Sequence, residues 1–137
     1  MKTAVMIIAA TLMLCSAVSA EMLIIVNKAV PVSQISPSEI SKIFLGQNQT
    51  WDDGTKISVG VLQDGAVHDD FLEQIVQKSS AQFDNYWKRM IFKGSCLPPS
   101  KFASEAELLK FVASTSGAIG YIDSATPHSN VKVVSNN

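Results

Sequence analysis

The sequence predicts one α/β domain in which a short mixed sheet is flanked by about four helices. Two observations carry this prediction. Short apolar runs of strand length alternate along the chain with longer segments whose apolar residues recur at helical spacing. Three of the longer segments open with a serine followed three residues later by Glu or Gln, the capping-box pattern that marks a helix start. The predicted order is strand, helix, strand, three helices, strand, strand.

The first half of the domain contains two strands and one helix. Residues 23–26 form a continuous apolar run, which is typical of a strand covered on both faces. A helix opens at Ser36, which can cap it, and ends at Gly46. A polar, turn-rich segment over residues 48–54 then leads to a second strand over residues 57–62.

The second half is mostly helical. A turn at Asp64-Gly65 opens a helix whose apolar residues continue to Val76, and a further helix begins at Ser79. Residues 94–101 predict a loop. The remaining elements are a helix from Ser104 to a stop at Gly117, and strands over residues 118–122 and 131–134.

The first twenty residues are typical of a cleavable secretory signal. Lys2 provides the positive start, residues 4–14 are almost entirely apolar, and Val18 and Ala20 supply the small side chains that a peptidase requires. The sequence therefore predicts a signal peptide over residues 1–20, a domain over residues 21–137, and a periplasmic location.

Two alternatives for this N-terminal segment are less consistent with the residues. A membrane anchor would need about 20 apolar residues to cross a bilayer, and the apolar run is about half that length. Lipidation of Cys15 would need a small residue before it, whereas Leu14 stands there.

Composition and charge exclude several classes of function. The formal net charge is −1, and no basic run or interleaved aromatic stripe is present, so no nucleic-acid partner is expected. After cleavage Cys96 is the single cysteine, and we interpret it as a partly buried thiol because neither His68 nor His128 is near it in sequence to act as a base. The acidic residues cluster at helix starts, where capping explains them. We therefore expect a non-catalytic protein without a cofactor.

Two blocks of sequence carry a resemblance to a known family. The first is Ile43-Phe44-Leu45-Gly46 followed by Trp51, and the second is Gly117-Ala118-Ile119-Gly120-Tyr121. Together with the order of elements, they resemble the phosphate-type substrate-binding proteins of ABC transporters, in a short-chain branch of that family. The resemblance implies a periplasmic-binding-protein-like fold. Full-length members close two α/β lobes on a ligand, and the blocks in this sequence correspond to one lobe.

The resemblance also implies an oxyanion site between the second strand and the helix that follows it. The family carries an Arg and then Ser-Gly-Thr in this loop, and the latter three positions fall on Gly65, Ala66 and Val67. No hydroxyl remains there, so backbone N–H groups at the helix start would have to hold the anion. The predicted ligand-binding residues are Gln63, Asp64, Gly65, Ala66, Val67, His68 and Arg89, the last because it is the only arginine in the chain.

The same loop allows two other interpretations. Asp64, Asp69 and Asp70 could simply complement the helix dipole, as acids at a helix start commonly do. They could also form a metal site with His68, but adjacent helical residues do not converge on one point, so no metal is predicted. Lys88 and Arg89 could likewise be no more than the solvated face of their helix.

Two functions remain open from the sequence. In the first, the protein binds a small oxyanion such as phosphate and delivers it to a membrane transporter or a sensor protein. In the second, it is a ligand-free lobe that acts as a protein-interaction or sensory module in the cell envelope. A homodimer could rebuild a two-sided cleft from two copies of the lobe.

Overall fold

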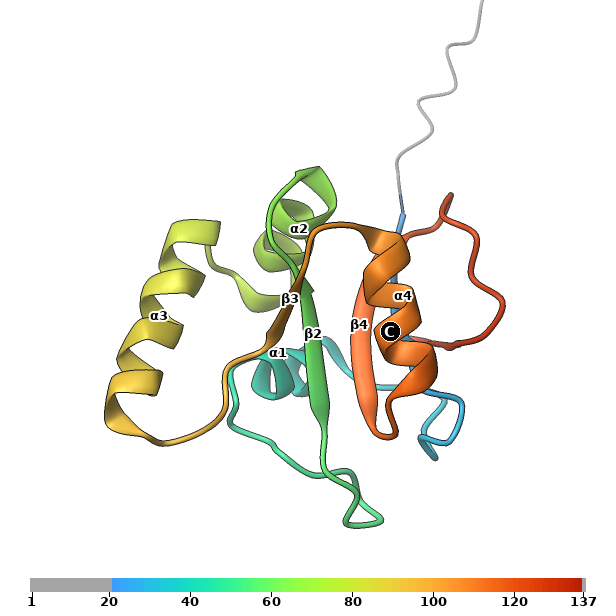
Figure 1. Cartoon of the computed structure of the whole chain (residues 1–137), viewed down its shortest axis with the longest axis horizontal. Helices are drawn as coiled ribbons and strands as arrows, with labels where there is room; N and C mark the ends of the chain where they lie inside the picture. Colours follow the sequence, from blue (N-terminus) through green and yellow to red (C-terminus); the bar gives the residue numbers. More distant parts are fainter. Residues whose placement is uncertain (1–20, 137) are drawn as a thin grey trace, which may run out of the picture.

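A computed structural model describes residues 21–136, and the predicted signal peptide lies outside these described residues (Figure 1). The described chain forms a five-stranded mixed sheet in the order β3-β2-β4-β1-β5. Its strands are β1 (Met22–Val26), β2 (Ser58–Leu62), β3 (Ser100–Phe102), β4 (Ala118–Asp123) and β5 (Lys132–Val134). Its helices are α1 (Pro37–Phe44), α2 (Ala66–Phe71), the π-helical turn η1 (Leu72–Val76), α3 (Ser80–Lys93) and α4 (Glu105–Ser114).

The strand directions make the sheet mixed. β2 runs parallel to both β3 and β4, whereas β1 runs antiparallel to both β4 and β5. β1 is paired on both edges and is contacted by α2 and α4, and Ile24, Ile25 and Val26 are at most 1% exposed. The predicted α/β class with a short mixed sheet is confirmed.

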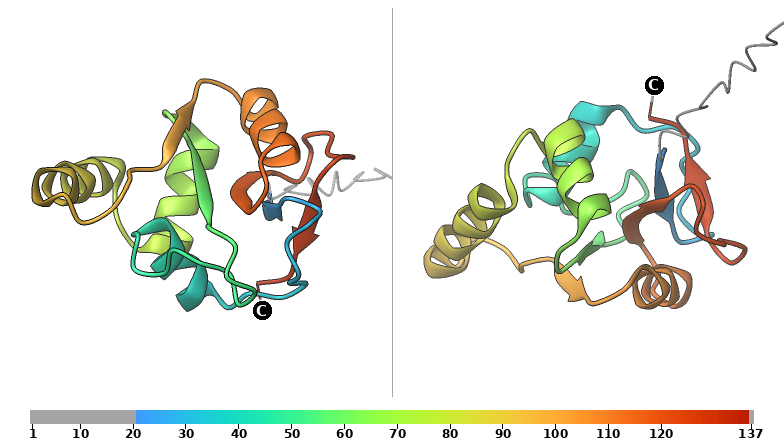
Figure 2. Two further views of the ribbon diagram at one scale, coloured as in Figure 1. Left: turned by 60° about the horizontal axis from the view of Figure 1, so that its bottom comes forward. Right: turned by 90° about the horizontal axis from the view of Figure 1, so that it is seen from above.

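Helices cover both faces of the sheet (Figure 2). α4 packs against β2, β4 and β1 on one face, and α2 contacts β1 and β4 on the other. Neighbouring residues of β4 show this division. Gly120 leaves room for Leu108 of α4, while the Tyr121 ring stacks on Phe71 of α2 with ring centroids 4.0 Å apart.

The predicted helix caps are present in the structure. The Ser36 and Ser104 hydroxyls each accept the N–H group three residues later, at 3.2 Å. The Ser79–Gln82 pair forms the complete reciprocal capping box. At α4 the Glu107 carboxylate instead accepts the N–H group of Ala103, one residue before the cap.

Two predicted elements were wrong in detail. Residues 94–101 were predicted as loop, but Ser100–Phe102 pairs with β2 as an edge strand. Its first two residues are exposed, so it carries no apolar run to reveal it. The single helix predicted after Gly65 is divided into α2 and the π-helical turn η1, which ends at Gln77 in the left-handed conformation.

No helix within residues 21–136 has both the length and the apolar character needed to cross a membrane.

Candidate functional site

The loop between β2 and α2 lies at the carboxyl-terminal end of β2. Gln63 leaves the strand with its N–H group donating to the Phe102 carbonyl oxygen at 2.9 Å, which ties this loop to the end of β3. The N-termini of α2 and α4 therefore lie at the same edge of the sheet (Figure 1). Ligands in α/β folds commonly bind at this edge, beyond the carboxyl ends of parallel strands.

Backbone donors dominate the start of α2. Its N-cap is Gly65, at φ 102°, which has no side chain to accept the first N–H groups of the helix. Those groups have no partner inside the helix, and the helix dipole adds partial positive charge at the same point. Ala66 is exposed and Val67 is half-buried, so a small anion could reach the N–H groups.

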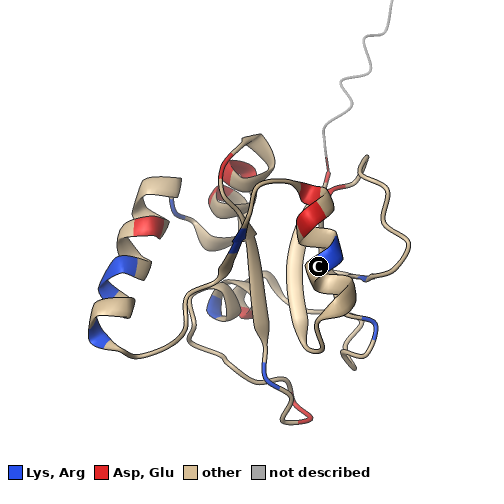
Figure 3. Ribbon diagram, viewed as in Figure 1, with Lys and Arg blue, Asp and Glu red and all other residues tan. Residues whose placement is uncertain are grey.

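Acidic residues occur near the start of α2 and at the start of α4 (Figure 3). Asp64, Asp69 and Asp70 are exposed around the start of α2, and Glu105 and Glu107 lie in the first turn of α4. No Lys or Arg occurs between Asp64 and Val76. Lys101 of β3 is a basic residue close enough to act electrostatically on His68. An anion at this loop would thus be held mainly by backbone dipoles, against the charge of the nearby aspartates.

His68 does not lie at the surface of this loop, although it was predicted as a ligand-binding residue. It is only 2% exposed, and its Nδ1 atom contacts the Tyr121 hydroxyl. The same hydroxyl accepts the Leu62 N–H group at 2.9 Å. With that donor satisfied, the hydroxyl is free to donate its own proton to His68 Nδ1, which places the remaining imidazole proton on Nε2.

Burial sets the charge state of both rings. Desolvation lowers the pKa of His68, and it outweighs the opposing effect of the nearby Asp69 carboxylate. Desolvation also raises the pKa of Tyr121 well above its usual value, since an anionic phenolate would be buried. At neutral pH the pair is therefore an uncharged hydrogen-bonded unit.

The predicted site residues are only partly brought together. Residues 63–67 share one largely exposed loop, and His68 lies buried beneath it. Arg89 is on the exposed face of α3, where it lines a surface hollow with Lys78 and Asn85 rather than the β2–α2 loop.

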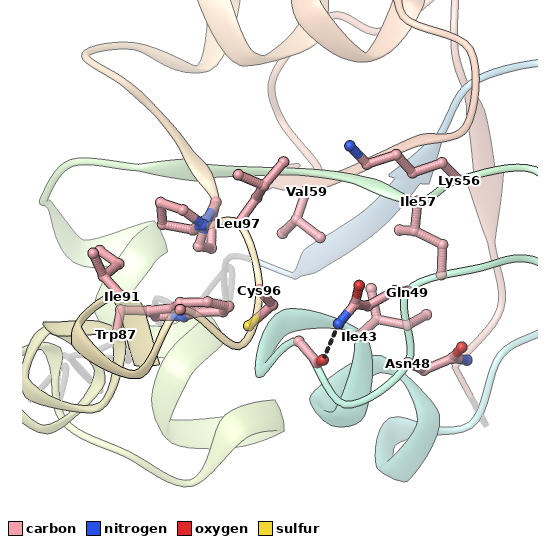
Figure 4. A pocket seen from close by; sticks show the side chains of 14 residues that line it. Ile43, Asn48, Gln49, Lys56, Ile57, Val59, Trp87, Ile91, Cys96 and Leu97 are labelled. Carbon is pink, nitrogen blue, oxygen red and sulfur yellow. Dashed lines mark hydrogen bonds between the residues drawn. The ribbon is translucent and has the colours of Figure 1, made fainter. Parts of the chain in front are cut away.

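A pocket that sequence reasoning missed lies between α1, α3 and the loops that follow them (Figure 4). It has a volume of about 470 Å³, and its walls are mostly apolar, with Ile57, Trp87 and Leu97 among them. Cys96 lies beside it and is partly buried, as predicted. The pocket is formed by segments about fifty residues apart in the chain, so no local sequence pattern predicts it.

Two polar features of this pocket stand out. Lys56 and Gln49 lie toward one end of it (Figure 4), and the Gln49 amide donates to the Gly46 carbonyl oxygen at 3.2 Å. The Trp87 indole N–H group is buried and has no hydrogen-bond partner among the described residues.

The described part of the chain has no candidate metal-binding site. Residues 21–136 contain no group of three or more His, Cys, Asp or Glu side chains placed to hold a metal ion.

The fold is that of a single periplasmic-binding-protein-like lobe. No protein-family model matches the sequence, and no curated protein matches it. Solved structures do match. One is a protein from Clostridium perfringens described as a phosphate ABC transporter substrate-binding protein with bound phosphate, with a TM-score of 0.67 and 21% identity over 84% of this chain and 44% of that chain.

Two further structures agree with it. An ABC-type phosphate transport receptor from Vibrio cholerae matches with a TM-score of 0.65 and 17% identity, over 84% of this chain and 45% of that one. PstS from Borrelia burgdorferi matches with a TM-score of 0.63 and 16% identity, over 86% of this chain and 47% of that one. The predicted resemblance is confirmed as a likeness of fold, and the chain spans less than half the length of each of these proteins.

Proposed function

We propose that the protein is an exported, non-catalytic solute-binding domain whose ligand is a small oxyanion, with phosphate as the first candidate. The fold likeness to phosphate-binding proteins supports this class of function. In the same proposal, residues 1–20 are the signal peptide and residues 21–137 form the periplasmic domain. A membrane transporter or a sensor protein would receive the ligand.

The observation that carries the proposal is the uncapped start of α2 at the carboxyl end of β2. Gly65 contributes no side chain, so the N–H groups of Ala66 and Val67 are left for a ligand. An anion there would gain charge-assisted hydrogen bonds together with the favourable helix dipole.

The acidic surroundings restrict which oxyanion suits the loop. Near pH 7 phosphate still carries at least one proton, whereas sulfate carries none. The Asp64 carboxylate could accept a hydrogen bond from a P–OH group, but it would only repel a fully ionised sulfate. The proposal therefore includes a preference for phosphate over sulfate.

Replacement of Ala66 by Pro tests this assignment by isothermal titration calorimetry with inorganic phosphate. Ala66 is the first residue of α2, a position where proline fits helix geometry and removes only the N–H group. We expect phosphate binding by the unmodified protein and at least about 10-fold weaker binding by Ala66→Pro, since one charge-assisted hydrogen bond contributes about 1.5–3 kcal/mol.

The matched control is Ser80→Pro, which makes the same change at the first residue of α3. This variant should bind phosphate as the unmodified protein does. Equal affinity in all three proteins would show that the α2 N–H groups do not hold the anion.

A second candidate function is a ligand-free lobe that acts as a protein-interaction or sensory module. The observation that favours it is the acidic character of the loop, where three aspartates lie around the start of α2 and no Lys or Arg occurs between Asp64 and Val76. Absence of any calorimetric signal with both phosphate and sulfate would support this function over the first. Solution mass from light scattering belongs to the same experiment, because a homodimer could complete a two-sided cleft.

A further inference from the structure

The carboxyl-terminal end of α3 presents an unusual exposed apolar surface. Among the described residues, four large apolar side chains are exposed, and Ile91, Phe92 and Leu97 account for three of them. Phe92 is 94% exposed and Leu97 is 73% exposed. We refer to residues 88–97 as the α3 tip. Single exposed apolar residues are ordinary, but a phenylalanine that is almost fully exposed is not. Ile91 and Leu97 also line the apolar pocket beside Trp87, whereas Phe92 lies outside it.

Helix geometry directs Phe92 away from the rest of the molecule. α3 is held to the body by its two buried residues, Phe83 and Trp87. At about 100° of rotation per residue, Phe92 lies roughly 180° around the helix from Phe83 and roughly 140° from Trp87. Figures 1 and 2 both place α3 at the outer edge of the molecule, so the tip is a convex projection.

Three basic side chains accompany the apolar residues. Lys88 and Arg89 precede Phe92 by four and three residues, so they share its face of the helix, and Lys93 follows it directly. All three are exposed. Figure 3 shows basic residues along α3. Within residues 21–136 the only ion pair joins Lys101 to Asp84, so none of the three cations is neutralised by a carboxylate of the described chain.

We propose that the α3 tip is a membrane-contact site that inserts into the interfacial region of an anionic lipid bilayer. Phe92 would enter the boundary between headgroups and acyl chains, while Lys88 and Arg89 contact the anionic headgroups. Exposed apolar side chains flanked by Lys and Arg are the features that bind helices to such an interface. This inference goes beyond the proposed function and does not depend on it.

Shape and charge favour a lipid surface over a second copy of the chain. A bilayer is flat and accepts a convex tip, whereas pairing two tips about a two-fold axis would bring their cations together. The chain as a whole has a formal net charge of −1, so its attraction to an anionic surface would be local to this tip rather than a property of the whole protein.

Vesicle co-sedimentation tests the proposal, using the purified protein with its N-terminus defined by mass spectrometry. One set of vesicles contains equal parts of phosphatidylglycerol and phosphatidylcholine, and the other contains phosphatidylcholine alone. We expect binding to the anionic vesicles, about 10-fold weaker binding to the neutral ones, and release at high salt. Phe92→Ser should weaken binding to the anionic vesicles by about 10-fold or more, because it removes the most exposed apolar side chain.

Charge-matched variants separate the tip from overall electrostatics. Each variant replaces three exposed basic residues by Gln, so both have the same net charge. The tip variant carries Lys88→Gln, Arg89→Gln and Lys93→Gln, and the control carries Lys28→Gln, Lys56→Gln and Lys110→Gln. We expect about 10-fold weaker binding by the tip variant and little change in the control.

The variant Phe92→Trp measures directly how deeply position 92 enters the bilayer. Trp51 and Trp87 are each 6% exposed, so the fluorescence of an indole at position 92 can be distinguished by its response to lipid. Brominated acyl chains should quench Phe92→Trp and leave the unmodified protein largely unchanged.

Several outcomes would overturn the proposal. These are no binding to anionic vesicles at low salt, equal binding by Phe92→Ser, and equal weakening by the two charge variants. A dimer in solution that Phe92→Ser dissociates would show instead that the tip is a contact between copies of the protein.

Discussion

Tyr121 joins three elements of the fold through one hydroxyl group. The ring lies on β4, the hydroxyl accepts the Leu62 N–H group of β2, and it contacts His68 of α2. Because the hydroxyl and the imidazole are both buried, each satisfies the other in place of water. His68 therefore anchors α2 to the sheet, which explains a histidine at this position without a ligand.

The burial of His68 predicts a pH dependence of stability. Its pKa is lowered in the folded protein from an ordinary value of 6.5, so the unfolded chain binds the proton more readily. The contribution of neutral His68 to the free energy of unfolding should therefore be fully present above about pH 6.5. The free energy of unfolding should decrease as the pH falls below that value. Urea denaturation at pH 7.5 and pH 5 measures this difference, in a range where few carboxylates titrate.

Substitution of His68 identifies the source of that dependence. His68→Gln should flatten the profile between these two pH values, while His128→Gln, in the loop before β5, should retain it. A pH dependence that persists unchanged in His68→Gln would contradict the assignment.

At the residue scale the sequence predicts chemistry only where partners are close along the chain. The loop of residues 63–67 could be located because it follows a recognisable strand. The role of His68 could not, since its partner Tyr121 is fifty-three positions away. Arg89 was predicted as a ligand-binding residue because it is the only arginine in the chain. It lies on α3, away from the β2–α2 loop, because its charge does not determine where its helix packs.

At the scale of elements, the two sequence blocks that carry the family resemblance are explained by packing. Gly46, at φ +72°, lets Trp87 and Cys96 approach, because a Cβ atom there would lie 2.8 Å from each. Gly117 similarly accommodates the backbone of Lys56, and its carbonyl oxygen accepts the Trp51 indole N–H group at 3.0 Å. These blocks therefore specify the fold and do not by themselves specify a ligand.

Alanine substitutions at Gly117 and Gly94 distinguish the cost of a steric contact from the cost of backbone strain. Both have positive φ, at +77° and +67°, but a Cβ on Gly117 would lie 2.2 Å from the Lys56 carbonyl oxygen, while a Cβ on Gly94 would meet nothing within 4 Å. We expect Gly117→Ala to reduce the free energy of unfolding by about 3 kcal/mol or more, and Gly94→Ala by about 1–2 kcal/mol. Urea denaturation compares them, and equal losses would contradict the packing role of Gly117.

Caps and strands differ in how far the sequence predicts them. The serine caps of α1, α3 and α4 act within three residues, so the local pattern was sufficient. β3 exists only because it pairs with β2 some forty residues earlier, and its exposed residues give no apolar signal. The π-helical turn after α2 is equally invisible, because its apolar spacing resembles that of a continuous helix.

At the scale of the whole molecule, the candidate anion-binding loop and the α3 tip lie in separate regions of the domain. The β2–α2 loop lies at one edge of the sheet, and the α3 tip projects from the side (Figure 1). The sequence predicted the class of fold and the loop, since both follow from the order of elements. It did not predict the apolar pocket or the tip, which depend on where α3 packs.

The comparison with larger proteins of similar fold bears on how tightly the proposed site would bind an anion. The matched region covers 44–47% of each of the three compared structures. In the function that we propose, the exposed β2–α2 loop would bind the anion without an enclosing second lobe. An anion bound in this way keeps part of its hydration, and we therefore expect weaker binding than an enclosed site would give.

The most direct test of the central claim is a nuclear magnetic resonance titration of the ¹⁵N-labelled protein with inorganic phosphate. We predict progressive, saturable shifts of the amide resonances of Gly65, Ala66 and Val67, with Ser80 at the start of α3 unaffected. Sulfate should produce smaller shifts at the same concentrations. Unchanged resonances at the start of α2, or equal shifts at Ser80, would contradict the claim that this loop holds an oxyanion.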